Sequence, residues 1–294
     1  MRILVVGAGA IGGYFGGRLL AAGRDVTFLV RAGRAAQLAA AGLAIRSKHG
    51  DLDLPAPPTV QAEALRSPFD LVLLSCKAYD LDGAMDSFAP AVGPDTAILP
   101  LLNGLQHLET LDRRFGARHT LGGLCMISST LDADGRVHHL NELHTLMFGE
   151  RDGASSTRVA AIVQDMWDKW MFIAGAAGIT CLMRAAIGDI VAAGGAGLAT
   201  SLAAECAAAA AAQGFAASEA ARRRLGSAIT APGSPIMASM LRDIERGAPI
   251  EADQIIYDLV RRGRADGLDL PLLAIVATHL KAYEARRARE NAIP

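Results

Sequence analysis

The sequence is poor in aromatic residues and carries almost no net charge. Aromatic side chains make up 5% of its 294 residues, whereas hydrophobic residues make up 51%, with alanine as a large part of that share. Small apolar side chains favour closely packed helices. A formal net charge of -1 provides neither a basic surface for a nucleic acid nor an acidic tail. We therefore expect no nucleic-acid partner, and the length suits two domains.

Cysteines and long apolar runs are also scarce. The cysteines are Cys76, Cys125, Cys181 and Cys206. No two of them have the spacing of a metal site, so we predict unpaired thiols in a reducing compartment and no bound metal. The uncharged apolar stretch 170–183 is shorter than the roughly 20 residues of a membrane span. Glycines interrupt the apolar start, which excludes a signal peptide, and we expect a soluble, cytoplasmic protein without a membrane partner.

The first half of the chain alternates strand and helix patterns. A helical pattern covers 11–22, and apolar runs occupy 2–6, 25–30, 71–75 and 97–101. Continuously apolar runs are typical of parallel strands that are covered on both faces. We therefore predict an α/β domain of the Rossmann type over residues 1–155, with a doubly wound parallel sheet. Two hairpins are predicted beside it, around His49-Gly50 and around 132–135.

The pattern changes after about Ser155. Six segments have helical spacing, separated by glycine or proline: 158–183, 198–213, 218–225, 236–246, 252–265 and 272–291. The alanine run 207–212 fits a buried helix, because alanine is the best helix former. The second half, residues 156–294, is therefore predicted to be an all-helical domain.

A glycine-rich motif follows the first predicted strand. Residues 7–12 read G-A-G-A-I-G, the G-x-G-x-x-G pattern of a dinucleotide-binding turn. In such a turn the first glycine allows the tight bend, the second lets the backbone approach a pyrophosphate, and the third lets helix and strand pack closely. The alternative is a plain glycine-rich turn. Because a strand precedes the motif and a helix opens within it, we predict these dinucleotide-binding residues: Gly7, Ala8, Gly9, Ala10, Ile11 and Gly12.

The end of the second predicted strand indicates which dinucleotide binds. NAD enzymes usually place a carboxylate there for the ribose 2′-hydroxyl, but none occurs between Phe28 and Gln37. Arg31 ends the strand instead, and Arg34 follows one turn later. Guanidinium groups suit a 2′-phosphate, so we predict NADP(H) as the cofactor. The alternative is that both arginines are solvated surface charges.

Two polar residues follow later strands at their carboxyl ends, where open α/β sheets bind ligands. They are Lys77 and Asn103. Each could contact the nicotinamide ribose or an acidic substrate, and each could equally be an ordinary loop residue. We include both as candidate cofactor-binding residues.

Lys169 is the main candidate for a chemical role. The fourteen residues after it carry no charge, and Trp167 and Trp170 flank it. A helix that is apolar all round is buried, so this lysine either extends to water or lies in a low-dielectric cleft. In a cleft, desolvation would lower its pKa and suit it to donate a proton. Glu251 could orient the lysine or bind a ligand hydroxyl. One of His138, His139 and His144 could be catalytic, but we favour a solvated loop for these histidines.

These residues, in this order, resemble the ketopantoate reductase family, the NADPH-dependent 2-dehydropantoate 2-reductases. The resemblance covers essentially the whole chain and rests on Arg31 and on 7–12, 76–78, 103–104, 167–169, 239–243 and 251–253. It implies a cleft between the two domains, in which a small 2-oxo acid is reduced to a 2-hydroxy acid. The leading substrate is 2-dehydropantoate, giving pantoate for pantothenate biosynthesis, and a homodimer is compatible with this plan.

The resemblance also implies a role for four residues. Lys169 matches the family's proton donor, and Asn103 matches a residue near both cofactor and substrate. Ser239 matches a substrate-binding serine, and Glu251 matches a carboxylate on the cofactor side.

The chain departs from the family at three positions that usually hold asparagine. They are Ile173, Ala177 and Ile256. Losing polar groups there predicts a more apolar pocket, so a different, more hydrophobic 2-oxo acid is the alternative substrate. A non-catalytic NADP(H) sensor is a further alternative, against which Lys169 and Glu251 argue, because a sensor needs only the nucleotide site.

Overall fold

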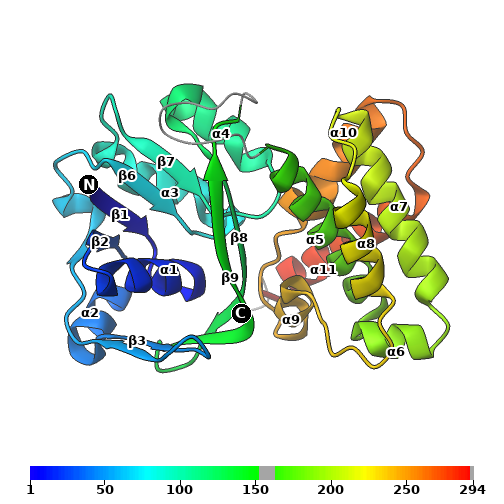
Figure 1. Ribbon diagram of the computed structural model, residues 1–294, viewed down its shortest axis with the longest axis horizontal. Coiled ribbons are helices and arrows are strands. Elements are labelled where there is room, and N and C mark those ends of the chain that lie inside the picture. Colours follow the sequence, from blue (N-terminus) through cyan, green and yellow to red (C-terminus); the bar gives the residue numbers. More distant parts are fainter. Residues whose placement is uncertain (152–162, 292–294) are drawn as a thin grey trace. The chain divides into compact units, whose positions relative to one another are not determined.

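A five-stranded parallel sheet lies at the centre of the N-terminal unit in the computed structural model, which describes residues 1–151 and 163–291 (Figure 1). Its strand order is β5-β2-β1-β6-β7. The strands are β1 (Arg2–Val6), β2 (Asp25–Leu29), β5 (Thr59–Val60), β6 (Leu71–Leu74) and β7 (Ala97–Pro100). The helices are α1 (Ala10–Ala21), α2 (Ala32–Ala41), α3 (Leu81–Phe88) and α4 (Gln106–Phe115), with short 3₁₀ turns at Ala62–Ala64, Ala78–Asp80, Ala89–Ala91 and Ala117–His119. The predicted parallel α/β plan is confirmed.

The side chains of the central strand β1 alternate between two apolar clusters. Ile3 and Val5 pack in the cluster that also holds buried residues of α1. Leu4 and Val6 pack in the other, with the buried face of α3. Since both faces of β1 are covered, nearly every position in it must be apolar, which explains the uninterrupted run in the sequence.

A second, four-stranded sheet joins the two predicted hairpins. Its order is β4-β3-β9-β8, formed by β3 (Leu43–Arg46), β4 (Leu52–Leu54), β8 (Gly122–Leu131) and β9 (Val137–Gly149). Strands β3 and β4 pair antiparallel, as do the long strands β8 and β9, which run side by side in Figure 1. Between the hairpins, β3 pairs with β9 in parallel, with Ile45 opposite Val137. The pairing of β3 with β9 was not predicted from the sequence, because the two strands are far apart in the chain.

The histidines near residue 139 lie in strand β9 and not in a solvated loop. His139 is buried, and its Nδ1 lies 2.9 Å from the hydroxyl of Ser47. The rings of His49 and His144 stack with their centres 3.8 Å apart. Nδ1 of His144 also lies 3.0 Å from the hydroxyl of buried Tyr14. The three imidazoles therefore pack against one another between α1 and the second sheet.

The helical unit holds seven α-helices and one π-helical turn among the described residues. They are α5 (Val163–Met183), α6 (Ile187–Ala192), α7 (Ala196–Ala212), α8 (Glu219–Ile229), α9 (Ser239–Glu245), η5 (Asp253–Tyr257, the π turn), α10 (Asp258–Ala265) and α11 (Pro271–Asn291). The sequence missed α6, and it predicted one regular helix where η5 and α10 follow each other. The first residues of the predicted helix 158–183 lie outside the described part.

Side-chain hydrogen bonds cap the first turns of α8 and α11. Ser218 caps α8, because its hydroxyl accepts a hydrogen bond from the amide of Ala221 (3.1 Å). The carboxylate of Glu205, from α7, accepts from the amides of Leu272 and Leu273 (2.9 and 2.8 Å) and so caps α11. Both bonds satisfy amides that have no partner within their own helix.

Small residues and buried thiols characterise the helix contacts. A Cβ added at Gly178 of α5 would lie 2.9 Å from a methyl carbon of Leu202 of α7, so these helices pack closely. Burial raises the pKa of both Cys181 and Cys206 to about 12, which makes these thiols poor nucleophiles. Within the described residues, no helix is both long and apolar enough to cross a membrane.

The chain divides into two units by its internal contacts. One comprises Met1–Leu102 and His107–Val163, and the other Asn103–Gln106 and Gln164–Pro294. The short segment after β7 therefore groups with the helices, although it lies within the first half of the sequence.

We predict that the imidazole cluster makes stability depend on pH. Partial desolvation of the exposed His144 ring, then the nearby charges of His49, His139 and Arg18, lower the pKa of His144. Below about pH 6.5, the usual pKa of histidine, the unfolded chain therefore binds more protons than the folded chain. The free energy of unfolding should fall as the pH drops through this range, as urea titrations at several pH values would measure.

Two single substitutions test the origin of that dependence. His144→Gln should lose less stability than the unaltered protein on acidification. His279→Gln, which removes a histidine on α11 outside the cluster, should keep the original dependence. An unchanged dependence in His144→Gln would contradict the assignment.

Candidate active site

The glycine-rich turn between β1 and α1 has the geometry of a dinucleotide-binding turn. Gly7 has φ +91°, a conformation that side chains with a Cβ rarely adopt. Gly9 caps α1, and a Cβ added there would meet nothing within 4 Å, so the backbone is open to a ligand. A Cβ at Gly12 would collide with the carbonyl oxygen of Gly7 and the hydroxyl of Ser75. Each glycine thus meets a different steric requirement of the turn.

Ser75 holds this turn against the neighbouring strand. It follows β6, and its hydroxyl donates to the carbonyl of Val6 (2.9 Å), with the carbonyl of Gly7 3.3 Å away. The hydrogen bond links the ends of β1 and β6 directly beneath the turn. Sequence reasoning gave Ser75 no role, because a single serine after a strand carries no distinctive pattern.

Arg34 braces the glycine-rich turn. Its Nε donates to the carbonyl of Ala8 (3.0 Å), and its Nη2 donates to the carbonyl of Gly135 in the β8–β9 hairpin (3.0 Å). Burial lowers the pKa of this guanidinium. Two of its five N–H donors are therefore bonded to backbone carbonyls, so Arg34 has a structural role in this turn.

Of the two arginines after β2, Arg31 is the one that extends to solvent. It occupies the N-cap position of α2 without a side-chain capping bond, and its side chain is 84% exposed. Its Nη2 lies 3.0 Å from a carboxylate oxygen of Asp80, which belongs to the turn after β6. A carboxylate therefore reaches the end of β2 from a distant part of the sequence, although none occurs in the adjacent segment.

The candidate residues of the first half follow neighbouring strands at one edge of the sheet. Strands β2, β1, β6 and β7 lie side by side and are parallel. Arg31 follows β2, the glycine-rich turn follows β1, Lys77 follows β6, and Asn103 follows β7. Lys77 is exposed, whereas Asn103 is half-buried and groups with the helical unit. Carboxyl edges of this kind are where doubly wound sheets bind ligands.

Lys169 is buried on α5 next to an aromatic stack. Only 8% of it is exposed, which argues against a lysine that extends to water. The rings of Trp167 and Trp170 lie 5.0 Å apart, and Trp167 also stacks on Phe215 at 5.3 Å. The tryptophans fix the turn of the helix that carries the ammonium group.

Asp168, the residue before Lys169, anchors the same turn. One carboxylate oxygen accepts from the hydroxyl of Ser218 (2.7 Å), and the other accepts from the amide of Gln164 (3.0 Å). Because Ser218 caps α8, this contact ties α5 to the start of α8. Sequence reasoning gave Asp168 no role of its own.

The π-helical turn η5 brings three candidate segments together. It begins two residues after Glu251, which is 8% exposed. Nε1 of Trp170 donates to the carbonyl of Ile255 (3.0 Å), so η5 lies beside the turn of Lys169. A Cβ at Gly104, where φ is +75°, would collide with the carbonyl of Gln254. The loop of Asn103 therefore also lies against η5, and π turns of this kind are frequent at functional sites.

The remaining predicted positions differ in accessibility. Ser239 is exposed at the first position of α9. Ala177 is 1% exposed and Ile256 is 0% exposed, so both belong to the packed interior of the helical unit. Ile173 is half-buried. Of the three positions that usually hold asparagine, Ile173 is the accessible one.

A Rossmann-type turn, a helical unit and a buried lysine together fit an oxidoreductase that uses a dinucleotide. Comparison with known proteins gives the family. The model for ketopantoate reductase PanE/ApbA matches residues 3–153, and the model for its C-terminal domain matches residues 161–284. The chain belongs to the ketopantoate reductase family.

Three relatives illustrate the range of this similarity. The chain is 36% identical to the uncharacterized oxidoreductase YkpB of Bacillus subtilis strain 168, over 98% of this chain and 100% of that protein. A structure of 2-dehydropantoate 2-reductase from Methylococcus capsulatus superimposes with a TM-score of 0.86 at 28% identity, covering 98% of each chain. D-mandelate dehydrogenase with NADH and anilino(oxo)acetate has the same fold, with a TM-score of 0.86 at 20% identity over 98% of this chain and 100% of that one.

Gly12→Ala should destabilise the protein, because its methyl group would collide with the backbone of the turn. Overpacking of this kind costs about 1–3 kcal/mol of unfolding free energy. Gly33→Ala is the matched control, because a Cβ added at Gly33 of α2 would have no other atom within 4 Å. This substitution should change the free energy of unfolding by at most about 1 kcal/mol, in the stabilising direction. Denaturant titrations of both variants measure the difference, and equal stability would show that α1 has room to shift.

Proposed function

We propose that the protein reduces a 2-oxo acid to a 2-hydroxy acid with NADPH, and that 2-dehydropantoate is the leading substrate, giving pantoate in pantothenate biosynthesis. Residues 1–155 would bind the nucleotide, and residues 156–294 the substrate. The observation that carries the proposal is the convergence on η5 of the segments of Lys169, Glu251 and Asn103. Family membership supports the same reaction class.

The chain's own residues fit a dinucleotide. The open backbone at Gly9 and the left-handed bend at Gly7 leave room for a pyrophosphate at the start of α1. The exposed guanidinium of Arg31 suits a 2′-phosphate. Asp80 opposes this preference, because its carboxylate already pairs with Arg31. NADPH binding would therefore replace one anionic partner of Arg31 with a more highly charged one.

Lys169 would supply the proton. When bound, the nicotinamide supplies hydride to the keto carbon of the substrate. The ammonium of Lys169 then donates a proton from Nζ to the oxygen on which negative charge develops. Burial of Lys169 limits competition from water. Glu251 would bind on the cofactor side, Asn103 would contact both ligands, and Ser239 would hold the substrate.

A more hydrophobic 2-oxo acid is the second candidate substrate, favoured by Ile173. Its side chain is accessible and has no polar atom, whereas the family usually places an asparagine there. A substrate group that lost its hydrogen-bond partner at this position would bind less well by about 1–3 kcal/mol. D-mandelate dehydrogenase, which has the same fold, was solved with anilino(oxo)acetate.

The cofactor preference should depend on Arg31. Arg31→Asp should lower the ratio of kcat/KM for NADPH over NADH by at least about tenfold, because a charge-assisted contact becomes repulsive. Asp80→Asn should raise that ratio, since it removes the competing carboxylate. Arg24→Asp makes the same charge change just before β2, at its opposite end, and should leave the ratio unchanged. Equal use of both cofactors by the unaltered protein would refute the NADPH assignment.

The reaction is tested by following NADPH oxidation against a panel of 2-oxo acids that includes 2-dehydropantoate. Lys169→Ala should lower kcat by at least about 100-fold, the lower range for general acid catalysis. The affinity for NADPH, measured by calorimetry, should barely change. Lys169→Arg should restore little, because a guanidinium does not release its proton at neutral pH.

The control for this test is Lys48→Ala. Lys48 is an exposed residue that pairs with Glu142 on the second sheet, and its loss should leave turnover unchanged. Oxidation of NADPH with none of the panel acids would refute the proposed activity. Near-normal turnover in Lys169→Ala would mean that another group donates the proton.

A further inference from the structure

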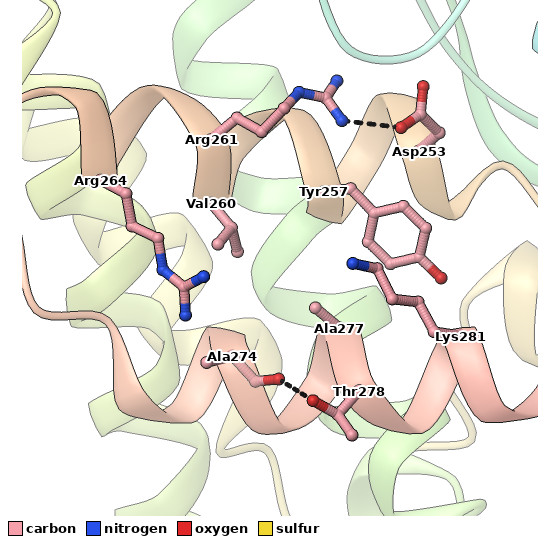
Figure 2. Close-up of a pocket in the computed structure, with 9 residues that line it drawn as sticks. All are labelled: Asp253, Tyr257, Val260, Arg261, Arg264, Ala274, Ala277, Thr278 and Lys281. Carbon is pink, nitrogen blue, oxygen red and sulfur yellow. Dashed lines mark hydrogen bonds and ion pairs between the residues drawn. The ribbon is translucent and has the colours of Figure 1, made fainter.

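A pocket of about 340 Å³ lies between η5–α10 and α11 in the helical unit (Figure 2). Its volume is at the lower end of the range for small-molecule sites, about 300–1,000 Å³. Neither Lys169, Glu251 nor Ser239 lines it. The pocket is therefore distinct from the candidate active-site residues, and ligand binding there does not depend on the proposed function.

The polar lining of the pocket is mainly cationic. Arg261 and Arg264 project from α10 and Lys281 from α11, whereas Asp253 is the one carboxylate of the lining. Asp253 is neutralised by Arg261, with Nη1 and Oδ1 2.8 Å apart. Within the described residues, neither Arg264 nor Lys281 has an ion pair or a side-chain hydrogen bond. Two positive charges are thus left to face one opening from opposite helices.

The floor of the pocket is apolar and aromatic. Small residues, Ala274 and Ala277 of α11, face Val260 of α10 and leave the space between the helices unfilled. Nζ of Lys281 lies 5.1 Å from the centre of the Tyr257 ring. The hydroxyl of Tyr257 donates to Glu284 (2.7 Å), and burial together with Glu284 raises the pKa of Tyr257, so this group stays protonated.

We propose that this pocket is a binding site for a small organic oxyanion, a phosphate or carboxylate with an apolar body. The guanidinium of Arg264 and the ammonium of Lys281 take the anionic group. The body of the ligand lies on Val260, Ala274 and the ring of Tyr257. A ligand with this combination satisfies both cations and covers the apolar floor, whereas inorganic phosphate satisfies the cations alone.

Titration calorimetry of the full chain with phenyl phosphate tests the site. Arg264→Gln/Lys281→Gln should weaken binding at least about tenfold, because two exposed charge pairs are lost. Ala274→Phe should weaken it similarly without changing any charge, since the new ring fills the floor. Inorganic phosphate should bind less tightly than phenyl phosphate. Benzoate in the same assay shows whether a carboxylate or a phosphate is preferred. Tighter binding of benzoate or phenyl phosphate than of inorganic phosphate supports the proposal.

Arg289→Gln is the matched control. Arg289 is an exposed arginine near the end of α11 that does not line the pocket, and its loss should leave binding within about twofold. An equal loss in Arg289→Gln would mean unspecific attraction and would overturn the proposal. Unchanged binding of phenyl phosphate by Arg264→Gln/Lys281→Gln would also overturn the proposal. If that double variant changed only the oligomeric state in size-exclusion chromatography, the face would be a contact between copies and the proposal would be wrong.

Discussion

The hydrogen bond from Trp170 to the carbonyl of Ile255 is the contact on which the helical unit's candidate site depends. A π turn leaves its carbonyls irregularly spaced, and a buried carbonyl without a partner costs about 1–3 kcal/mol. The indole satisfies one such carbonyl and at the same time fixes the turn of α5 that carries Lys169. Glycine at position 104 lets a further loop approach the same turn. The candidate site residues of the helical unit therefore lie around one segment of five residues, which begins two residues after Glu251.

The glycine-rich turn between β1 and α1 is likewise held in place by side chains from other segments. Its backbone bends at Gly7 and packs closely at Gly12, so no side chain of its own can hold it in place. Ser75 and Arg34 provide that support from outside, by hydrogen bonds to the carbonyls of Val6 and Ala8. Arg34 therefore uses two of its N–H donors on backbone carbonyls. The other arginine, Arg31, is exposed and pairs with Asp80.

The sequence allowed prediction of features that arise from local patterns. Uninterrupted apolar runs gave the parallel strands, because β1 is covered on both faces, and the spacing of three glycines gave the turn at the start of α1. Features that join distant segments escaped prediction. The pairing of Ile45 with Val137, and the approach of Asp80 to Arg31, have no signature in either segment alone. The π turn also escaped, because its apolar spacing is close to that of an ordinary helix.

Substrate choice can be narrowed by the burial of the three positions that depart from the family. Ala177 and Ile256 lie in the packed interior, where an added amide would need its own hydrogen-bond partners. Apolar side chains suit both positions, because both are buried. Ile173 is different, because a half-buried side chain can contact a ligand. Under the proposed function, discrimination between a polar and an apolar 2-oxo acid would rest largely on the side chain of Ile173. One missing hydrogen bond changes affinity by roughly five- to a hundredfold, which would be enough to shift the substrate preference under the proposed function.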